Sequence, residues 1–431
     1  LVGSEMCIRD RNGEALMASI LVYTSPARGH LFPALGVALE LQRRGHEVHV
    51  RTLAEEMDRV AALGLGVRAI DPEIEARDLD DWRAGNPMKA LELAMKTFGD
   101  RAAFEVDDLR NAIEETSADA LLVDTNSWGA QAAAEAAGLP WAAFQPYFTP
   151  LPGRGVPPFG PGFRLATGPL GRLRDAVLGK LIFGRMSALA LPGINAPRTR
   201  LGLPPLDSMD SFLTRPPRVI YFTARALEYP RASWPKNFSF VGPATWGPEA
   251  EQPEWLADVD SPIILVTCST ERQEDRVILE AALDGLPQQG LFVVGTSAAF
   301  TPEEIAAEPR ARTRVERFIP HDTILPRAAA VVCHGGMGIT QRALAHGVPL
   351  VVVPFGRDQL EVARRVEHAG VGVRLSPKKT NATSLASAVH QAQALAADAR
   401  RMADAFTEAG GDGAAADVLE ELLREKTRNA S

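Results

Sequence analysis

The stretch AAVVCHGGMGITQRALAHGVPLVVVP, residues 329–354, decides the fold of this 431-residue chain. It holds two apolar runs, residues 329–333 and 350–353, on either side of an amphipathic segment at residues 339–346. Near-continuous apolar runs predict strands that are covered on both faces, and a strand–helix–strand order is the unit of a parallel α/β sheet. The glycines after His334 let the chain turn tightly from the first strand into the helix.

The same alternation continues along the chain in two halves. In the first half it predicts a helix at residues 33–44 and strands at residues 19–24, 47–52, 67–70, 120–123, 141–144 and 218–223. In the second half it predicts strands at residues 263–267, 291–294, 329–333 and 350–353, and helices at residues 274–283, 339–346, 357–369, 383–407 and 414–426. The predicted fold class is therefore α/β, with two facing Rossmann-like domains and a ligand-binding cleft between them.

The chain is longer than the ~250–300 residues at which a single core stops growing. We expect a first domain at residues 17–241, a Pro- and acid-rich linker at residues 242–260, and a second domain at residues 261–405, followed by a C-terminal helix at residues 406–431. Residues 1–16 have neither helical nor strand periodicity. We expect them to be a non-native extension ahead of a native start at Met17.

The composition is that of a soluble globular protein, with 46% hydrophobic and 23% charged residues. A formal charge of −8 argues against a nucleic-acid partner, because there is no basic surplus to neutralise phosphates. Three cysteines are too few and too scattered for a disulfide framework and predict a reducing cytoplasm. The longest apolar runs have about eight residues, short of the ~20 that cross a bilayer. We expect a cytoplasmic monomer or dimer without a membrane span.

In the second half, hydrogen-bonding residues follow three of the predicted strands: Ser269 and Thr270, the His334 turn, and Asp358 with Gln359. Carboxyl ends of parallel strands meet at one sheet edge, where ligands bind. A glycine turn that opens a helix can hold a diphosphate through its free N–H groups, with Thr340 adding a hydroxyl. A glycine turn that merely packs helix on strand, with a structural His334, remains an alternative, and so does Asp358 as an ordinary first-turn residue.

In the first half, His30 follows the first strand, and Asp124 follows the strand at residues 120–123. An imidazole is a natural general base, and a neighbouring carboxylate would fix its tautomer and stabilise the imidazolium. Asp124 as a simple helix cap is the alternative.

Residues 148–171 are rich in Pro and Gly without a period, which is typical of a binding-site wall. With Trp128, Tyr147 and Phe148 nearby, we expect this segment to shape a pocket for an acceptor. Asp-x-Asp pairs at residues 78–80 and 258–260 could in principle hold a metal ion, but both lie in solvated acidic runs. We therefore expect no metal site.

Several motifs in fixed order resemble the UDP-glycosyltransferase superfamily, inverting enzymes with the GT-B fold, and in particular bacterial macrolide-type natural-product glycosyltransferases. The resemblance covers residues 17 to about 424. It rests on Gly29-His30-x-x-Pro33, Leu122-Val-Asp124, Phe318-Ile-Pro-His321-x-x-Ile-Leu325, His334-Gly-Gly-x-Gly-x-Thr340, Gly347-Val-Pro349 and Pro354-x-x-x-Asp358-Gln359.

The resemblance implies an acceptor-binding first domain, a nucleotide-sugar-binding second domain, and a C-terminal helix that returns to the first domain. It implies His30 as base and Asp124 as its orienting acid, and Asp358 and Gln359 as ligands of the transferred sugar. The nucleobase would lie at Phe318, Ile319 and His321. The diphosphate would lie at Ser269, Thr270, His334, Gly336, Met337, Gly338, Ile339 and Thr340.

The implied reaction is inverting transfer of a hexose, with glucose favoured, from a UDP- or dTDP-sugar to a hydroxyl of a small lipophilic acceptor such as a polyketide or flavonoid. The nucleotide sugar is a co-substrate, and no cofactor is implied. Arg342 departs from the family, which often has a ribose-binding Glu there, because a guanidinium cannot accept hydrogen bonds. A sugar-nucleotide epimerase and a non-catalytic binding protein are the alternatives.

Overall fold

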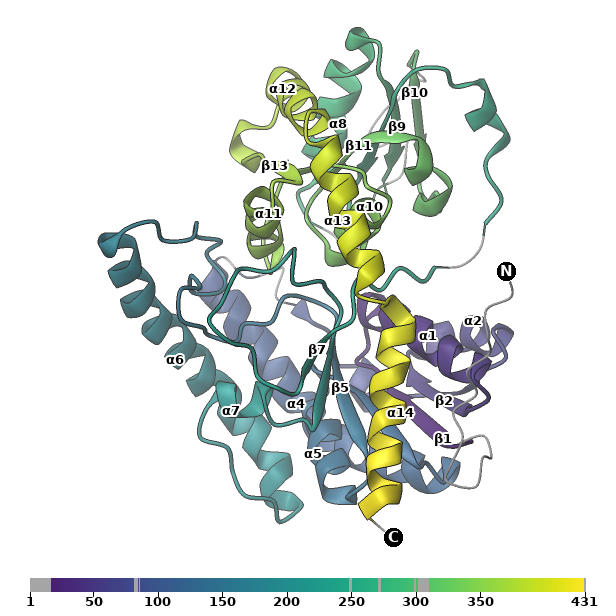
Figure 1. The fold of residues 1–431 in the computed structure, drawn as a ribbon, viewed down its shortest axis with the longest axis vertical. Helices are drawn as coiled ribbons and strands as arrows, with labels where there is room; N and C mark the ends of the chain where they lie inside the picture. The colour runs from purple at the N-terminus through teal and green to yellow at the C-terminus, as the bar shows by residue number, and fades with distance from the viewer. Residues whose placement is uncertain are drawn as a thin grey trace.

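The computed structural model describes residues 17–429 apart from 81–83, 85, 248–249, 270–272, 298–299 and 301–309. Within these residues the chain forms two lobes, each built on one parallel sheet (Figure 1). The predicted two-domain α/β class is confirmed. The predicted extension at residues 1–16 and the site residue Thr270 lie outside the described residues.

The first lobe has a seven-stranded sheet in the order β3-β2-β1-β4-β5-β6-β7, with all neighbours parallel. Its strands are β1 (Ser19–Tyr23), β2 (Glu47–Thr52), β3 (Gly66–Ala69), β4 (Ala120–Asp124), β5 (Trp141–Gln145), β6 (Arg218–Tyr221) and β7 (Phe238–Phe240). Its helices are α1 (Arg28–Arg43), α2 (Met57–Ala62), α3 (Pro72–Glu75), α4 (Pro87–Thr116), α5 (Trp128–Ala137), α6 (Pro169–Arg200) and α7 (Met209–Leu213).

The second lobe has a six-stranded parallel sheet in the order β10-β9-β8-β11-β12-β13. Its strands are β8 (Ile263–Thr267), β9 (Phe292–Thr296), β10 (Thr313–Glu316), β11 (Ala328–Cys333), β12 (Leu350–Val352) and β13 (Gly372–Arg374). The helices in this part of the chain are α8 (Arg276–Gly285), α10 (Met337–Ala345), α11 (Gln359–His368), α12 (Ala382–Gln393), α13 (Ala396–Glu408) and α14 (Gly411–Asn429).

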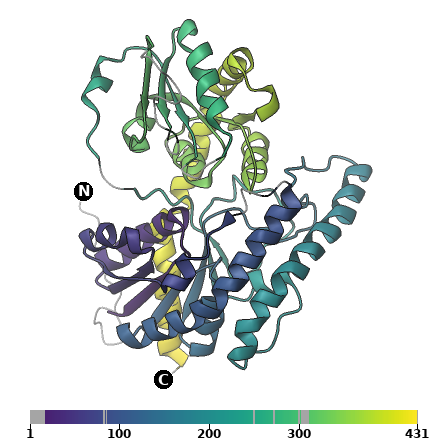
Figure 2. The same cartoon turned by 180° about the vertical axis from the view of Figure 1, so that it is seen from behind.

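The main differences from the sequence predictions concern helices. Helix α1 begins at Arg28 rather than at Pro33, so His30 lies inside its first turn and not in the loop before it. The predicted helix at residues 383–407 is two helices, because α12 packs on the sheet of the second lobe whereas α13 packs on α10. The long helices α4 and α6, which the periodicity did not single out, run side by side along one flank of the first lobe (Figure 2).

The last two helices connect the lobes. Helix α13 lies on the second lobe, and α14 crosses to the first and packs against α1 (Figure 1). Arg44 at the end of α1 binds Asp417 at 2.6 Å and Glu420 at 2.9 Å on α14. Gly36 permits the close approach, since a Cβ there would lie 2.4 Å from the Asp412 carboxylate.

Charged side chains also join the lobes directly. Arg365 on α11 is 1% exposed and binds Glu228 of the first lobe at 2.9 Å and Glu361 on its own helix at 2.8 Å. Its guanidinium lies between the rings of Phe148 and Tyr229, 4.4 and 4.3 Å from their centres. The lobes are therefore joined by a buried, fully paired cation.

Candidate active site

His30 and Asp124 lie together at the carboxyl edge of the first sheet. His30 is in the first turn of α1, directly after β1, and Asp124 is the last residue of the neighbouring strand β4. The Nδ1 atom of His30 is 2.8 and 3.0 Å from the two carboxylate oxygens of Asp124. This contact leaves the Nε2 atom of His30 as the nitrogen available for chemistry.

Asp124 is fully buried, and every contact it makes favours the carboxylate. It accepts hydrogen bonds from the backbone N–H and the hydroxyl of Ser25 at 2.9 and 2.8 Å, and from the backbone N–H of Asn126 at 2.9 Å. Burial raises the pKa of Asp124, but the His30 charge and these hydrogen bonds outweigh it and leave the pKa below its ordinary value. Asp124 therefore stays ionised and can stabilise an imidazolium at His30.

Two residues that the sequence analysis did not assign to the base complete its surroundings. The side-chain nitrogen of Asn126 is 3.4 Å from Nε2 of His30, and the hydroxyl of Tyr147 donates to the Asn126 carbonyl oxygen at 2.6 Å. The Tyr147 ring centre lies 5.7 Å from that of His30. Asn126 follows Asp124 by two residues, but no pattern in the sequence marks it, because its role depends on the fold of the strand end.

The glycine turn of the second lobe opens α10 at the carboxyl edge of the second sheet. Gly335 has φ +97°, and a Cβ there would lie 2.8 Å from Val352, so the turn requires glycine. Gly336 is the N-cap of α10, and Met337, Gly338 and Ile339 begin the helix. The free N–H groups of this first turn form an anion-binding end.

His334 stands beside this turn as a neutral imidazole. Burial and the Arg357 charge lower the pKa of His334 to about 4. Its Nδ1 atom has no hydrogen-bond partner among the described residues and is 3.9 Å from the buried carboxylate of Asp275. Asp275 also accepts from the backbone N–H of Ser269 at 2.6 Å. Ser269 and His334 therefore converge on one carboxylate that the sequence analysis did not name.

Asp358 and Gln359 lie at the start of α11. The amide oxygen of Gln359 accepts from the backbone N–H groups of Phe355 and Gly356 at 2.8 and 3.2 Å, so this side chain also holds the turn in place. Arg357, just before the helix, has φ +51°, a strained conformation for a residue other than glycine. Strain of this kind is typical of turns that present functional groups.

Asp358 of the second lobe interacts electrostatically with residues of the first lobe. Burial raises the pKa of Asp358, and the charges of Arg357 and His30 partly oppose this. Burial and the charges of Asp124 and Asp358 raise the pKa of Tyr147 well above its ordinary value. His30 and Tyr147 of the first lobe therefore lie close enough to Asp358 of the second lobe for their charges to affect one another.

The turn after β10 carries the residues expected at a nucleobase. Phe318 is 71% exposed, the Ile319 side chain is buried, and His321 lies 3.4 Å from the Thr296 hydroxyl. Burial and the Arg342 charge lower the pKa of His321 to about 4. An exposed aromatic ring three residues before a buried, neutral imidazole suits a stacked base.

Arg342 is engaged within the protein. Its guanidinium binds the Asp322 carboxylate and the backbone carbonyl oxygen of Trp246. His346 lies 3.6 Å from the same carboxylate. The Asp322 carboxylate therefore lies beside Arg342, although position 342 itself holds a cation.

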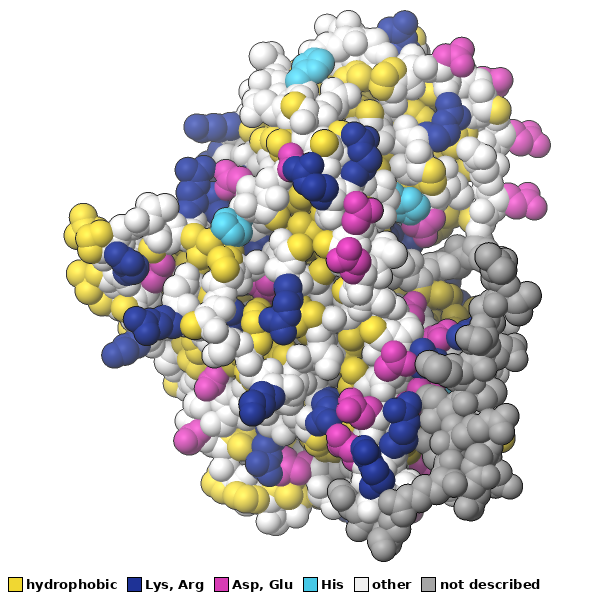
Figure 3. Space-filling view, in the orientation of Figure 1, with side chains coloured by type: hydrophobic (Ala, Val, Ile, Leu, Met, Phe, Trp, Pro, Cys, Tyr) yellow, Lys and Arg dark blue, Asp and Glu magenta, His cyan; other side chains and the backbone are white. Residues whose placement is uncertain are grey.

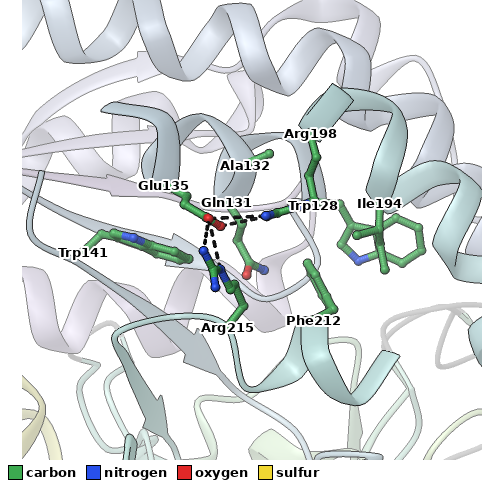
Figure 4. Close-up of a pocket in the computed structure, with 9 residues that line it drawn as sticks. All are labelled: Trp128, Gln131, Ala132, Glu135, Trp141, Ile194, Arg198, Phe212 and Arg215. Atoms are coloured by element: carbon green, nitrogen blue, oxygen red, sulfur yellow. Dashed lines mark hydrogen bonds and ion pairs between the residues drawn. The ribbon is translucent and has the colours of Figure 1, made fainter. Parts of the chain in front are cut away.

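Three of the predicted site residues lie in the protein interior. Trp128 and Phe148 are 2% and 0% exposed and belong to the hydrophobic core, and Thr340 is fully buried. Trp128 lines a small cavity together with Ile194 and Phe212. Figure 4 shows that Glu135 in this cavity binds Arg198 and Arg215, so the carboxylate is paired with two cations.

Among the described residues, no group of three or more His, Cys, Asp or Glu side chains could hold a metal ion.

Comparison with known proteins identifies the family. Residues 293–422 match the family model "Erythromycin biosynthesis protein CIII-like, C-terminal domain". The chain is 33% identical over 390 residues to 4'-demethylrebeccamycin synthase of Lentzea aerocolonigenes, which covers 86% of this chain and 91% of that protein. The chain belongs to the natural-product glycosyltransferases. This glycosyltransferase is also 27% identical to demethyllactenocin mycarosyltransferase of Streptomyces fradiae, over 95% of this chain and 88% of that one.

Solved structures share the fold of this glycosyltransferase. The kitacinnamycin glycosyltransferase matches with a TM-score of 0.74 at 24% identity, covering 94% of this chain and 99% of the other. The calicheamicin glycosyltransferase CalG4 matches with a TM-score of 0.72 at 21% identity, covering 96% and 100%. The two parallel-sheet lobes are therefore a GT-B fold.

Proposed function

We propose that this glycosyltransferase moves glucose from UDP- or dTDP-glucose to a hydroxyl of a small lipophilic acceptor, such as a polyketide or flavonoid, with inversion at the anomeric carbon. The observation that supports this most directly is the His30–Asp124 pair, which lies within electrostatic reach of Asp358 across the cleft. An oriented base on one lobe and a sugar-binding carboxylate on the other are what direct transfer needs.

In the proposed reaction, Nε2 of His30 takes the proton of the acceptor hydroxyl as its oxygen attacks the anomeric carbon. A new carbon–oxygen bond forms on the face opposite the leaving group, and the bond between the sugar and the diphosphate breaks. The negative charge moves to the nucleoside diphosphate, and the N-terminus of α10 stabilises it. Asp124 stabilises the imidazolium, and the mechanism uses no metal ion.

Donor recognition is proposed for the second lobe. The exposed Phe318 ring would stack on the nucleobase, the first turn of α10 would hold the diphosphate, and Asp358 would accept from sugar hydroxyls. One related structure, a Streptomyces glycosyltransferase named SsfS6, was solved in complex with thymidine diphosphate; it matches with a TM-score of 0.68 at 20% identity, covering 94% of this chain and 99% of that one. The choice between UDP and dTDP is part of the proposal.

Acceptor recognition is proposed for the first lobe, at Tyr147 and the irregular residues 148–168 that follow it. The Asn126 amide nitrogen lies 3.4 Å from Nε2 of His30, and the Tyr147 hydroxyl donates to the oxygen of the same amide. A pocket that combines apolar walls with few polar groups suits a small lipophilic molecule.

The test is a transfer assay with UDP-glucose and dTDP-glucose against a panel of phenolic and polyketide acceptors, with product configuration read by NMR. We expect a β-glucoside from an α-linked donor, at a rate that EDTA does not change. His30→Ala should abolish transfer, and Asp124→Asn should lower kcat by about 10³-fold through loss of imidazole orientation. His334→Ala should mainly raise the donor KM.

The other outcomes of this assay separate the alternatives. Epimerised donor without an acceptor would identify a sugar-nucleotide epimerase. Tight donor binding by calorimetry without turnover, for every acceptor, would identify a binding protein. Transfer that survives in His30→Ala would overturn the assigned base.

A further inference from the structure

Helix α6 exposes an apolar stripe. Four of the seven large hydrophobic side chains that are exposed in the described part of the chain lie on it: Leu170, Leu173, Val177 and Leu181 are 82%, 61%, 56% and 67% exposed. Their spacing of three, four and four residues places them along one face of the helix. Single exposed hydrophobic residues are ordinary on a protein surface, but a continuous stripe indicates an interaction surface.

Only the second half of α6 is anchored in the protein core. Met186, Ala190 and Ile194 are buried there against α4 and α5. The first half projects from the body of the molecule (Figure 1), and hydrophobic side chains gather at the projecting end with Lys and Arg side chains beside them (Figure 3). The stripe therefore faces outward, away from the core.

The same segment concentrates positive charge in an acidic protein. Residues 169–184, the first half of α6, contain three Lys or Arg and one acidic residue, Asp175, although the whole chain carries a formal charge of −8. Asp175 is itself paired with Arg174 at 2.6 Å. Arg172 and Lys180 are exposed next to the stripe, and no ion pair to the described residues engages either one.

We propose that the first half of α6 binds the surface of an anionic membrane. The apolar stripe enters the boundary between headgroups and acyl chains, while Arg172 and Lys180 contact lipid phosphates. In the described part of the chain, α6 is the one helix that is long and apolar enough, by length and composition alone, to cross a membrane. Because its second half is packed into the first lobe, it lies on the membrane and does not cross it.

Charge favours a lipid surface over a second copy of the chain. A two-fold dimer through this face would bring Arg172 and Lys180 of both copies together, and like charges repel at such an interface. An anionic bilayer offers the complementary charge together with an apolar layer. The proposal does not depend on the proposed transfer reaction, so its test measures membrane binding directly.

The test is co-sedimentation of the full-length protein with vesicles of phosphatidylcholine and with vesicles containing 30% phosphatidylglycerol. We expect binding to the anionic vesicles that falls at least tenfold in 1 M NaCl, and little binding to the neutral ones. Leu173→Gln/Val177→Gln should lower binding to the anionic vesicles at least tenfold, and Leu173→Met/Val177→Met should retain it. Arg172→Gln/Lys180→Gln should lower it several-fold.

A matched control removes the same charge elsewhere. Lys378→Gln/Lys379→Gln alters two exposed lysines of the second lobe and should leave vesicle binding unchanged. Melting curves and sedimentation velocity on each variant check folding and self-association. The proposal is overturned if the native protein does not bind anionic vesicles, or if Arg172→Gln/Lys180→Gln and Lys378→Gln/Lys379→Gln lower vesicle binding equally. It is also overturned if the only effect of Leu173→Gln/Val177→Gln is to dissociate a dimer or to raise the acceptor KM.

Discussion

In the proposed reaction, the acceptor hydroxyl must come within hydrogen-bond distance of the Nε2 atom of His30. In this structure the Asn126 amide nitrogen lies 3.4 Å from that atom. Because the Asp124 carboxylate accepts a hydrogen bond from Nδ1–H, the neutral imidazole carries its lone pair on Nε2, and the Asn126 amide donates to it. An incoming hydroxyl must displace this amide, which Tyr147 holds by a 2.6 Å hydrogen bond to its oxygen. We therefore propose that Asn126 is a positioning residue that keeps the proposed base oriented until the acceptor arrives.

Asn126→Asp tests this position through the pH dependence of transfer. A carboxylate beside Nε2 stabilises the imidazolium, and a protonated imidazole cannot act as a base. We expect the acidic limb of the kcat/KM profile to move upward by about one pH unit, whereas Asn126→Ala should lower the rate without moving the limb. An unmoved limb in Asn126→Asp would place residue 126 outside contact with the base.

The buried imidazoles of His321 and His334 couple stability to pH. Both have a pKa of about 4 in the folded protein, below the ordinary value of 6.5. As the pH falls from 6.5 to 4 the unfolded chain takes up protons that the folded chain refuses, so the stability that these residues contribute is present above pH 6.5 and is lost over this window. The loss amounts to roughly 3 kcal/mol for each residue at most.

Urea unfolding between pH 7 and pH 4.5 measures this effect. His321→Gln/His334→Gln should lose less stability than the native protein over this range. The two proteins are compared with each other because burial raises the pKa of Glu105 to about 8 and that of Asp412 to about 6, and both carboxyl groups add stability as the pH falls. The ion pairs of Glu135, whose pKa the neighbouring arginines lower to about 2, respond only below about pH 4.5 and therefore do not interfere. Equal slopes for both proteins would show that these imidazoles titrate normally.

At the scale of elements, α11 is held to the first lobe by Arg365, which is buried with Glu228 and Glu361. Arg365→Met leaves two buried carboxylates without a cation and should cost about 3–5 kcal/mol in urea unfolding. Adding Glu228→Gln and Glu361→Gln removes both buried charges and should restore most of the loss. The amide oxygen at position 361 can still accept from Gly160 and Gly162, and the amide at position 228 can accept from the Tyr229 N–H while it donates to the Tyr221 hydroxyl. If the triple variant is no more stable than Arg365→Met, the loss comes from packing against the aromatic rings and not from charge.

The elements that the sequence predicts well are those whose apolar runs are covered on both faces, such as β8, β11 and β12. Helix boundaries are harder to predict because they depend on tertiary contacts. Pro33 was taken as the start of α1, but the helix begins five residues earlier at Arg28 and accommodates the proline. The long helix α6 has no clean amphipathic period, since its first half has an apolar outer face and its second half an apolar inner one.

At the scale of the whole molecule, the site divides into residues that local motifs reveal and residues that only the fold brings in. His30, Asp124 and the His334 turn follow strands, and the carboxyl edge of a parallel sheet collects such residues wherever they lie in the chain. Asp275 and Asp322 reach the site through contacts with residues far along the chain or on other elements, so no spacing announces them. Burial of Trp128 and Phe148 likewise depends on which helices cover them.

Arg342 binds both Asp322 and the carbonyl oxygen of Trp246, so we expect donor choice to depend on how the second lobe and the linker meet. A UDP-sugar has a ribose 2′-hydroxyl that a dTDP-sugar lacks, and a guanidinium cannot accept a hydrogen bond from it. Arg342→Glu supplies an acceptor, and we expect it to raise the ratio of kcat/KM for UDP-glucose over dTDP-glucose by about tenfold, the value of a hydrogen bond to a charged group. Arg342→Gln is the control, since it frees Asp322 without adding a carboxylate. A rise in both variants assigns the ribose contact to Asp322, and a constant ratio in both places the ribose away from residue 342.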